Sequence, residues 1–166
     1  MCGLTGGWSR KRFEVLREAL PAMGGAINHR GPDDGGQWLD ADAGIAIAHR
    51  RLAIIDLSTA GHQPMHSSSK RWVIAYNGEI YNHLELRDEL ERSNSAPLWK
   101  GHSDTETLLA AIENWGVDEA LRRSHGMFAF ALWDQQEKCL WLARDRFGEK
   151  PLYYGWNRGV FLFGSE

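Results

Sequence analysis

The chain has 166 residues, a length that suits one domain with a substantial hydrophobic core, so we expect a single domain over residues 1–166. Its hydrophobic fraction of 43%, charged fraction of 25% and eight tryptophans are typical of a folded protein and exclude a disordered or fibrous one. The formal net charge of -3 comes from interspersed acidic and basic residues, and we therefore expect neither nucleic acid nor a membrane as a partner.

Short apolar runs predict a series of strands along the chain. We expect them at Leu4–Trp8, Gly44–Ile55, Trp72–Tyr76, Met127–Trp133, Cys139–Ala143, Leu152–Trp156 and Val160–Phe163. The run Met127–Trp133 is apolar at every position, which indicates a strand that is covered on both faces. Short polar connections such as Asn157-Arg158-Gly159 are typical of antiparallel hairpins and disfavour parallel winding.

Helices are predicted at about Lys11–Met23, Asn82–Ser93 and Ser103–Trp115. The third is the best marked, because Ser103 and Glu106 can form a capping box and Gly116 supplies a stop. Helices that cover antiparallel sheets buried on both faces imply a layered sandwich, and two such sheets packed together give four layers. We therefore predict an α+β fold built as a four-layer αββα sandwich.

The charged first twenty residues and the absence of a run of roughly 20 apolar residues predict a cytoplasmic protein without a membrane anchor. The two cysteines, Cys2 and Cys139, lie far apart and form no CxxC pair that would suggest zinc or redox chemistry. His62 and His66 flank Pro64, which prevents the helical spacing used by a zinc helix. We expect no metal ion.

Cys2 directly follows the initiator methionine and is the first candidate for chemistry. A small second residue permits removal of Met1, which would leave a free α-amine beside the Cys2 thiol. The reference pKa of an α-amine is about 7.7 to 8.0, so a useful fraction is neutral and can accept the thiol proton. A small buried residue at the start of a strand would give the same local pattern.

Two further segments carry charge where a structural and a functional interpretation compete. His29–Gly35 is rich in charges and turn formers, which predicts an irregular loop, either one that holds functional residues or a solvated turn. Arg51 lies in an apolar run, where a guanidinium needs a carboxylate partner. A bound amino acid is one candidate for that partner, and Asp56 or another carboxylate of the protein is the commoner arrangement.

Later motifs are equally ambiguous when taken alone. Asn77-Gly78 is typical of a hairpin turn, but it also offers two donors of the kind that stabilise a tetrahedral oxyanion. Asp104 lies in the first turn of its helix, where it interacts with the helix dipole or binds a substrate ammonium. The charged segment Arg144–Pro151 lacks the spacing of a phosphate-binding loop, and we predict a structural ion-pair loop there.

Taken together, these motifs make the chain resemble the N-terminal glutaminase domain of asparagine synthetases. The matching segments follow one another in order and are Met1-Cys2-Gly3, His29–Gly35, His49–Asp56, Tyr76–Asn82, Ser103–Glu106, Gly126–Asp134 and Arg144–Tyr154. Each is weak alone, and their order over nearly the whole chain makes the resemblance specific. It implies a class II glutamine amidotransferase with the N-terminal-nucleophile hydrolase fold and L-glutamine as substrate.

The resemblance also implies a role for individual residues. Cys2 is implied as the nucleophile, and Asn77 with Gly78 as the oxyanion hole. Arg51 is implied to bind the α-carboxylate of glutamine and Asp104 its ammonium group. The rest of the pocket is implied to come from Leu52, Ala53, Ile54, Ile55 and Glu79, with Arg30 and Asn82 as supporting residues.

One departure from the family pattern is large. Asparagine synthetases continue into an ATP-pyrophosphatase domain with an SGGxDS loop, which this sequence lacks. We expect the domain to supply ammonia to such a synthetase domain, with aspartate as the expected acceptor. ATP and Mg would be needed in that synthetase domain, whereas we expect no cofactor in residues 1–166. A glutaminase domain serving another acceptor and a non-catalytic glutamine-binding regulatory module stay open. Apolar surface left by a missing domain would favour a homodimer.

Overall fold

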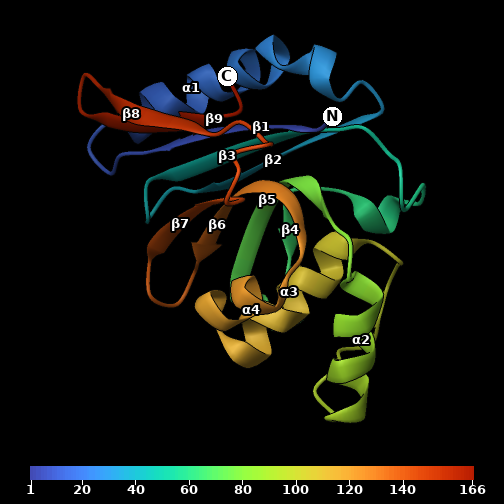
Figure 1. The fold of residues 1–166 in the computed structure, drawn as a ribbon. Helices are drawn as coiled ribbons and strands as arrows, with labels where there is room; N and C mark the ends of the chain where they lie inside the picture. The colour runs from blue at the N-terminus through green and yellow to red at the C-terminus, as the bar shows by residue number, and fades with distance from the viewer.

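The computed structural model describes residues 1–166 and contains two antiparallel sheets packed face to face (Figure 1). The first sheet has the strand order β2 (Asp34–Asp40), β3 (Ile45–Arg51), β1 (Gly3–Trp8), β9 (Val160–Gly164) and β8 (Tyr153–Asn157). The second has the order β4 (Met65–His66), β5 (Trp72–Ile80), β6 (Gly126–Asp134) and β7 (Cys139–Arg144).

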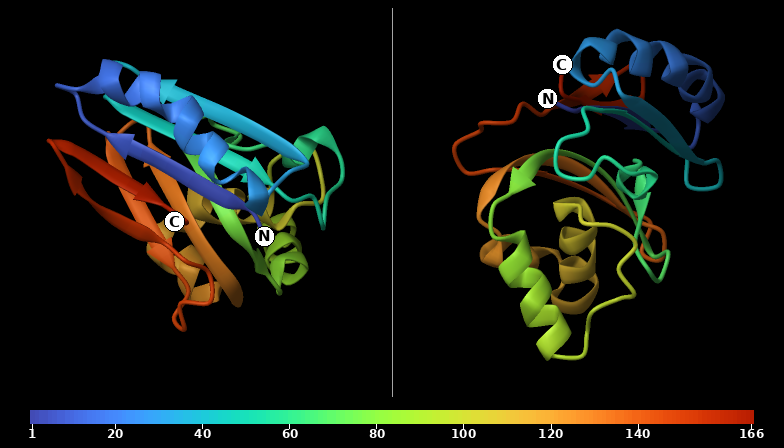
Figure 2. Two further views of the ribbon diagram at one scale, coloured as in Figure 1. Left: turned by 90° about the horizontal axis from the view of Figure 1, so that it is seen from above. Right: turned by 90° about the vertical axis from the view of Figure 1, so that its right-hand side faces the viewer.

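Helices form the two outer layers (Figure 2). Helix α1 (Phe13–Ala26) covers the outer face of the first sheet, where it packs on β1 and β3. Helix α3 (Asp104–Trp115) packs on β5 of the second sheet, with α2 (His83–Arg92) and α4 (Val117–Arg123) beside it. Single 3-10 turns occur at Asn28–Arg30 and Thr59–Gly61. The predicted α+β sandwich of four layers is confirmed.

The alternation of side chains along β5 and β6 fills two layers of core. Val73, Ala75 and Trp133 belong to the cluster between the sheets. Their strand neighbours Ile74 and Phe130 belong to the cluster between the second sheet and its helices. Because both alternating sets are buried, these strands are apolar at successive positions, as expected for a sheet covered on both faces.

The strand boundaries differ from the prediction in two places that matter for function. The run predicted as a strand over Gly44–Ile55 leaves the sheet after Arg51, so residues from Leu52 onward form a loop. Strand β5 continues beyond Tyr76 to Ile80, pairing with β6 along its whole length. The hairpin turn at Asn77-Gly78, which was one of two interpretations of this pair, is therefore wrong, whereas the hairpins joining β6 to β7 and β8 to β9 are confirmed.

Two strands and one α-helix were not predicted. Strand β2 begins at Asp34, inside the segment expected to be irregular, and its two glycines hide its β character. Its side chains alternate between half-buried and exposed, and the strand lies at the edge of its sheet, where pairing with β3 stabilises it. Strand β4 has two residues and α4 seven, which is too short for a clear periodic signal.

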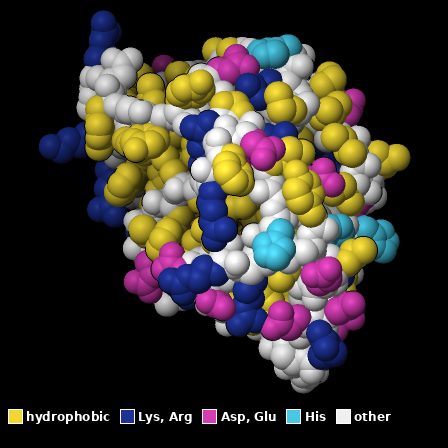
Figure 3. Space-filling view, viewed as in Figure 1, with side chains coloured by type: hydrophobic (Ala, Val, Ile, Leu, Met, Phe, Trp, Pro, Cys, Tyr) yellow, Lys and Arg dark blue, Asp and Glu magenta, His cyan; other side chains and the backbone are white.

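Strand β8 forms the other edge of the first sheet and carries exposed aromatic side chains. Tyr153, Tyr154 and Trp156 are 63%, 71% and 72% exposed. Figure 3 shows hydrophobic side chains gathered on the side of the molecule where Figure 1 places β8. The surface is of the kind that favours association with another protein surface, and a homodimer stays a prediction.

Candidate active site

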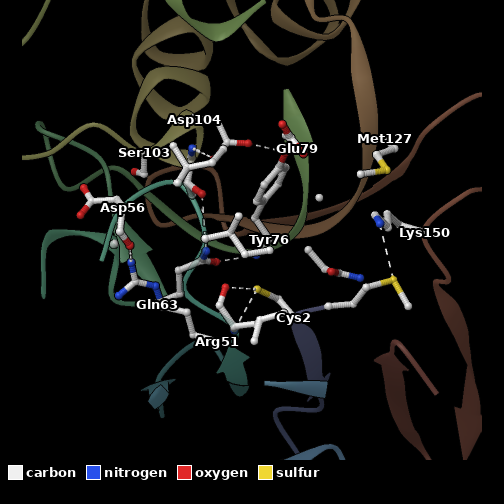
Figure 4. Close-up of a pocket in the computed structure, with 18 residues that line it drawn as sticks. Cys2, Arg51, Asp56, Gln63, Tyr76, Glu79, Ser103, Asp104, Met127 and Lys150 are labelled. Atoms are coloured by element: carbon white, nitrogen blue, oxygen red, sulfur yellow. Dashed lines mark hydrogen bonds between the residues drawn. The ribbon is translucent and has the colours of Figure 1, made fainter. Parts of the chain in front are cut away.

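A cavity of about 340 Å³ opens where the start of β1, the end of β3, the middle of β5 and the N-terminus of α3 come together (Figure 4). It brings together most of the residues that the sequence singled out. Those lining it are Cys2, Arg51, Leu52, Ile54, Ile55, Asn77, Gly78, Glu79 and Asp104. Side chains separated by up to about a hundred positions in the sequence therefore share one pocket.

Cys2 lies half-buried at the floor of this pocket, just before β1. Its Sγ accepts a hydrogen bond from the Leu52 amide at 3.4 Å and lies 3.6 Å from the Leu52 carbonyl oxygen. Burial raises the pKa of the Cys2 thiol, while the Leu52 amide, the N-terminal ammonium and Arg51 oppose that rise. The thiol therefore needs a base if it is to react as a thiolate at neutral pH.

The pocket wall is an edge of β5 that has no strand partner. Strand β4 pairs only with Val73 and Ile74, because it begins at Met65, opposite Ile74. Beyond it, the Tyr76 amide donates to Gln63 Oε1 at 2.7 Å and the Ile80 amide to Asp104 Oδ2 at 2.9 Å. Alternate residues of a strand direct their amides to the same side, so the Gly78 amide points to this edge as well.

Asn77 is buried within the strand, with 1% of its surface exposed, and its Nδ2 has no hydrogen-bond partner. An unmet buried donor costs about 1 to 3 kcal/mol, so the side chain is held ready for an acceptor at the expense of stability. Next to it, a Cβ on Gly78 would overlap the Met127 carbonyl oxygen of β6. Glycine is thus required by the close approach of the two strands, which brings the Gly78 backbone to the pocket wall.

Arg51 is the positive group of the pocket nearest to the loop after β3. Its guanidinium donates to the Ser58 carbonyl oxygen at 2.9 Å and to that of Asp56. The structure contains no salt bridge between Arg51 and a carboxylate, because the Asp56 carboxylate accepts instead from Ser58 and from the His102 amide. The structural ion pair that competed as an interpretation is therefore wrong, and the guanidinium has no carboxylate of the protein within salt-bridge distance.

Asp104 is the matching negative group, at the N-terminus of α3. It is 5% exposed, and its Oδ2 accepts from the Tyr76 hydroxyl and the Ile80 amide, each at 2.9 Å. Burial raises the pKa of Asp104, and these two hydrogen bonds oppose that rise. Figure 4 shows Arg51 and Asp104 on different sides of the pocket, an arrangement that suits the two charges of a free amino acid.

Three residues that the resemblance implied do not line the cavity. The Ala53 amide donates to Asp33 Oδ2 at 2.9 Å, which ties the loop to the segment before β2. Arg30 donates to Glu166 Oε1 at 2.6 Å and packs behind the start of β1. The Asn82 side chain donates to the Arg123 carbonyl oxygen and accepts from the His125 amide, so it holds the connection from α4 to β6.

Other residues were missed, because no local pattern identified them. Gln63, Tyr76 and Lys150 line the cavity, and Gln63 also fixes the Tyr76 amide. His49, on β3, hydrogen-bonds through Nε2 to the Tyr76 carbonyl oxygen at 2.9 Å. Burial lowers the pKa of His49 to about 4, so the ring is neutral at physiological pH and donates this bond. Both backbone groups of Tyr76 are thus fixed beside Asn77.

Residues 1–166 match the family described as the glutamine amidotransferase domain, and the chain belongs to that family. It is similar to asparagine synthetases [glutamine-hydrolyzing] 3 and 1 of Bacillus subtilis, with 38% and 39% identity over 100% of the chain. The chain spans 26% of the length of each of these relatives.

Among solved structures, it is similar to the glutamine phosphoribosylpyrophosphate amidotransferase of B. subtilis, with a TM-score of 0.77 and 22% identity. That alignment covers 99% of this chain and 42% of the other, and it shows a shared fold. None of the helices has both the length and the apolar character that a membrane crossing requires.

Proposed function

We propose that this domain hydrolyses L-glutamine to glutamate and ammonia, with Cys2 as the nucleophile once Met1 has been removed. The observation that carries the proposal is a single pocket that holds the Cys2 thiol, an unpartnered Asn77 donor and the opposite charges of Arg51 and Asp104. Membership of the glutamine amidotransferase family and the similarity to glutamine-hydrolyzing relatives support it. The proposed domain comprises residues 1–166.

Glutamine would bind through its two charged groups. Its α-carboxylate would pair with Arg51, which has no carboxylate of the protein as a partner, and its ammonium with Asp104, assisted by Glu79. Leu52, Ile54 and Ile55 would cover the side-chain methylenes. A volume of about 340 Å³ is within the range of small-molecule sites.

The proposed chemistry is acyl transfer through a thioester. The α-amine of mature Cys2 accepts the thiol proton, and the sulfur attacks the side-chain amide carbon of glutamine. The Asn77 Nδ2 and the Gly78 amide donate to the oxyanion. The amine then passes its proton to the departing nitrogen, the carbon–nitrogen bond breaks, and ammonia leaves. Water attacks the γ-glutamyl thioester, which releases glutamate and restores the thiol.

Ammonia would be consumed by a synthetase domain that follows this one in a longer protein. The chain covers about a quarter of its asparagine synthetase relatives, which supports that arrangement. Aspartate is the proposed acceptor, in an ATP-dependent reaction that gives asparagine. Sequencing the gene beyond Glu166, and testing aspartate and ATP with the longer product, would show whether this acceptor or another is used.

The glutaminase proposal is tested by measuring glutamate and ammonia release from L-glutamine, using protein whose intact mass shows that Met1 is absent. Cys2→Ala should abolish turnover. Cys139→Ala is the matched control, because Cys139 is the other cysteine and lies exposed on β7 away from the pocket. Equal turnover in Cys2→Ala would exclude Cys2 as nucleophile. Glutamine binding without hydrolysis by the processed wild type would instead favour a regulatory module.

A further inference from the structure

Lys150 is a buried cation for which the proposed chemistry has no role. It lines the same cavity as Cys2 and has 8% of its surface exposed. No carboxylate lies within salt-bridge distance of its ammonium, and the one hydrogen-bond contact of Nζ is with the Met1 sulfur at 3.5 Å. A buried charge is costly unless it is paired, so stability does not explain this placement.

The loop that carries Lys150 is built to fix its backbone. The Asp145 carboxylate accepts hydrogen bonds from the amides of Phe128, Phe147, Glu149 and Lys150. Arg144 donates to the carbonyl oxygens of Lys150 at 2.9 Å and Gly148 at 2.6 Å. The prediction of an ion-pair loop is therefore wrong, because these charged side chains bind the backbone and hold Lys150 at the cavity.

Covalent geometry places the Lys150 ammonium close to the N-terminus of the mature protein. Five bonds connect the Met1 sulfur to the Cys2 nitrogen, which limits their separation to about 6 Å. Adding the 3.5 Å contact keeps Lys150 Nζ within about 10 Å of the Cys2 nitrogen. Figure 4 shows the bond from Lys150 to this sulfur, on the side of the pocket away from Arg51. Loss of Met1 would remove that contact and leave a new α-amine nearby.

We propose that Lys150 is a positioning residue whose fixed positive charge keeps the α-amine of mature Cys2 unprotonated and able to accept the thiol proton. The inference rests on the proposed function. Two positive charges close to each other repel, which lowers the pKa of both groups. The group with the lower pKa is the first to lose its proton. An α-amine, with a reference pKa of about 7.7 to 8.0, loses its proton before a lysine, for which the reference value is about 10.4.

The other charged groups of the pocket do not replace Lys150. Asp56, Glu79 and Asp104 are acidic and act in the opposite direction. Arg51 acts in the same direction in the free protein, but the carboxylate of bound glutamine would neutralise it. Lys150 has no such partner, so its effect on the amine persists when substrate is bound.

The test compares Lys150→Met, which keeps the length of the side chain without its charge, with Lys150→Arg, which keeps the charge. In protein labelled with carbon-13 at cysteine, two residues give signals, and the Cα of mature Cys2 reports the protonation of its amine. The titration midpoint should rise by about one pH unit in Lys150→Met, the size expected for charges about 10 Å apart at an effective dielectric constant of about 20. It should return toward the wild-type value in Lys150→Arg.

The pH profile of kcat/KM supplies a second readout. Its acidic limb should move to higher pH by the same amount in Lys150→Met, with a loss of up to about tenfold at low pH and recovery at high pH. An unchanged Cys2 midpoint, or an equal loss of activity at every pH, would overturn the inference. Turnover by the wild type tests the glutaminase proposal separately, since the titration of the amine needs no substrate.

Protein stability checks the premise. Removing an unpaired buried charge should leave Lys150→Met at least as resistant to urea as the wild type. Unfolding of both variants under native conditions would show that the ammonium has a structural partner and would overturn the inference.

Discussion

Replacing Asn77 with alanine should remove activity without removing stability. Loss of one oxyanion donor lowers kcat by about 10²–10³, or about 3 to 4 kcal/mol of transition-state stabilisation. In the free protein the Asn77 Nδ2 makes no hydrogen bond although the side chain is 1% exposed. The substitution therefore breaks no hydrogen bond of Nδ2. It also removes the cost of a buried donor without a partner, about 1 to 3 kcal/mol, which offsets the loss of packing. The free energy of unfolding should change by less than about 1 kcal/mol.

The assay pairs steady-state glutamate formation with urea denaturation of the same preparations. Asn82→Ala is the comparison, because Asn82 lies outside the pocket and both ends of its amide are bonded, at 2.9 Å to Arg123 and 2.8 Å from His125. That variant should lose about 1 to 3 kcal/mol of stability and keep kcat within about twofold.

Two outcomes would refute this reasoning. A kcat for Asn77→Ala within about tenfold of the wild type would show that Nδ2 does not stabilise the transition state. A loss of more than about 3 kcal/mol in the unfolding free energy would show that Asn77 stabilises the folded protein. Any loss of activity would then reflect damage to the fold and not the loss of an oxyanion donor.

Three further substitutions test other parts of the structure. Arg51→Lys should raise KM for glutamine at least about tenfold in steady-state kinetics, because an ammonium lacks the planar fork of five N–H donors that can bind two backbone carbonyls and still pair with both oxygens of a carboxylate; an unchanged KM would contradict this role. Gly78→Ala should lower the unfolding free energy in urea by about 1 to 3 kcal/mol, since its Cβ overlaps the Met127 carbonyl oxygen, and wild-type stability would contradict that overlap. The pKa of His49 is lowered from 6.5 to about 4, so the unfolded chain binds a proton at higher pH than the folded chain does. Stability should therefore fall by up to about 3 kcal/mol as the pH drops from about 7 to 4, and His49→Gln should flatten that slope in urea titrations; equal slopes would refute the buried neutral ring.

Much of the fold could be predicted because its signals are local. Half of the predicted capping box is present, because the Glu106 amide donates to Ser103 Oγ at 3.2 Å whereas the Glu106 carboxylate accepts from the amides of Lys100 and Gly101 and not from that of Ser103. The strands that are apolar on both faces form the middle of the sandwich. The strand predicted at Trp72–Tyr76 was too short, because the turn propensity of Asn77-Gly78 is a local property. In the structure, nine consecutive residue pairs with β6 keep these two residues in the strand. Tertiary pairing there outweighs the preference of two residues.

The site was harder to predict from the sequence, because the residues that support it are far apart in the chain. Gln63 and His49 fix Tyr76 across 13 and 27 positions, and neither stands in a pattern that local periodicity would reveal. Lys150 was concealed in a segment interpreted through its charges alone. The sequence showed that charged groups were present, but the direction in which Asp145 and Arg144 point depends on the turn after β7.

The shortness of β4, which leaves part of the β5 edge without a strand partner, has a consequence for amide hydrogen exchange. The amides of Tyr76 and Ile80 are bonded to buried side chains and should exchange with solvent only through large openings of the protein. The Gly78 amide between them faces the cavity and should exchange without such an opening. One rapidly exchanging amide flanked by two slow ones would thus mark this edge, and an occupied pocket should slow that amide while leaving its neighbours unchanged.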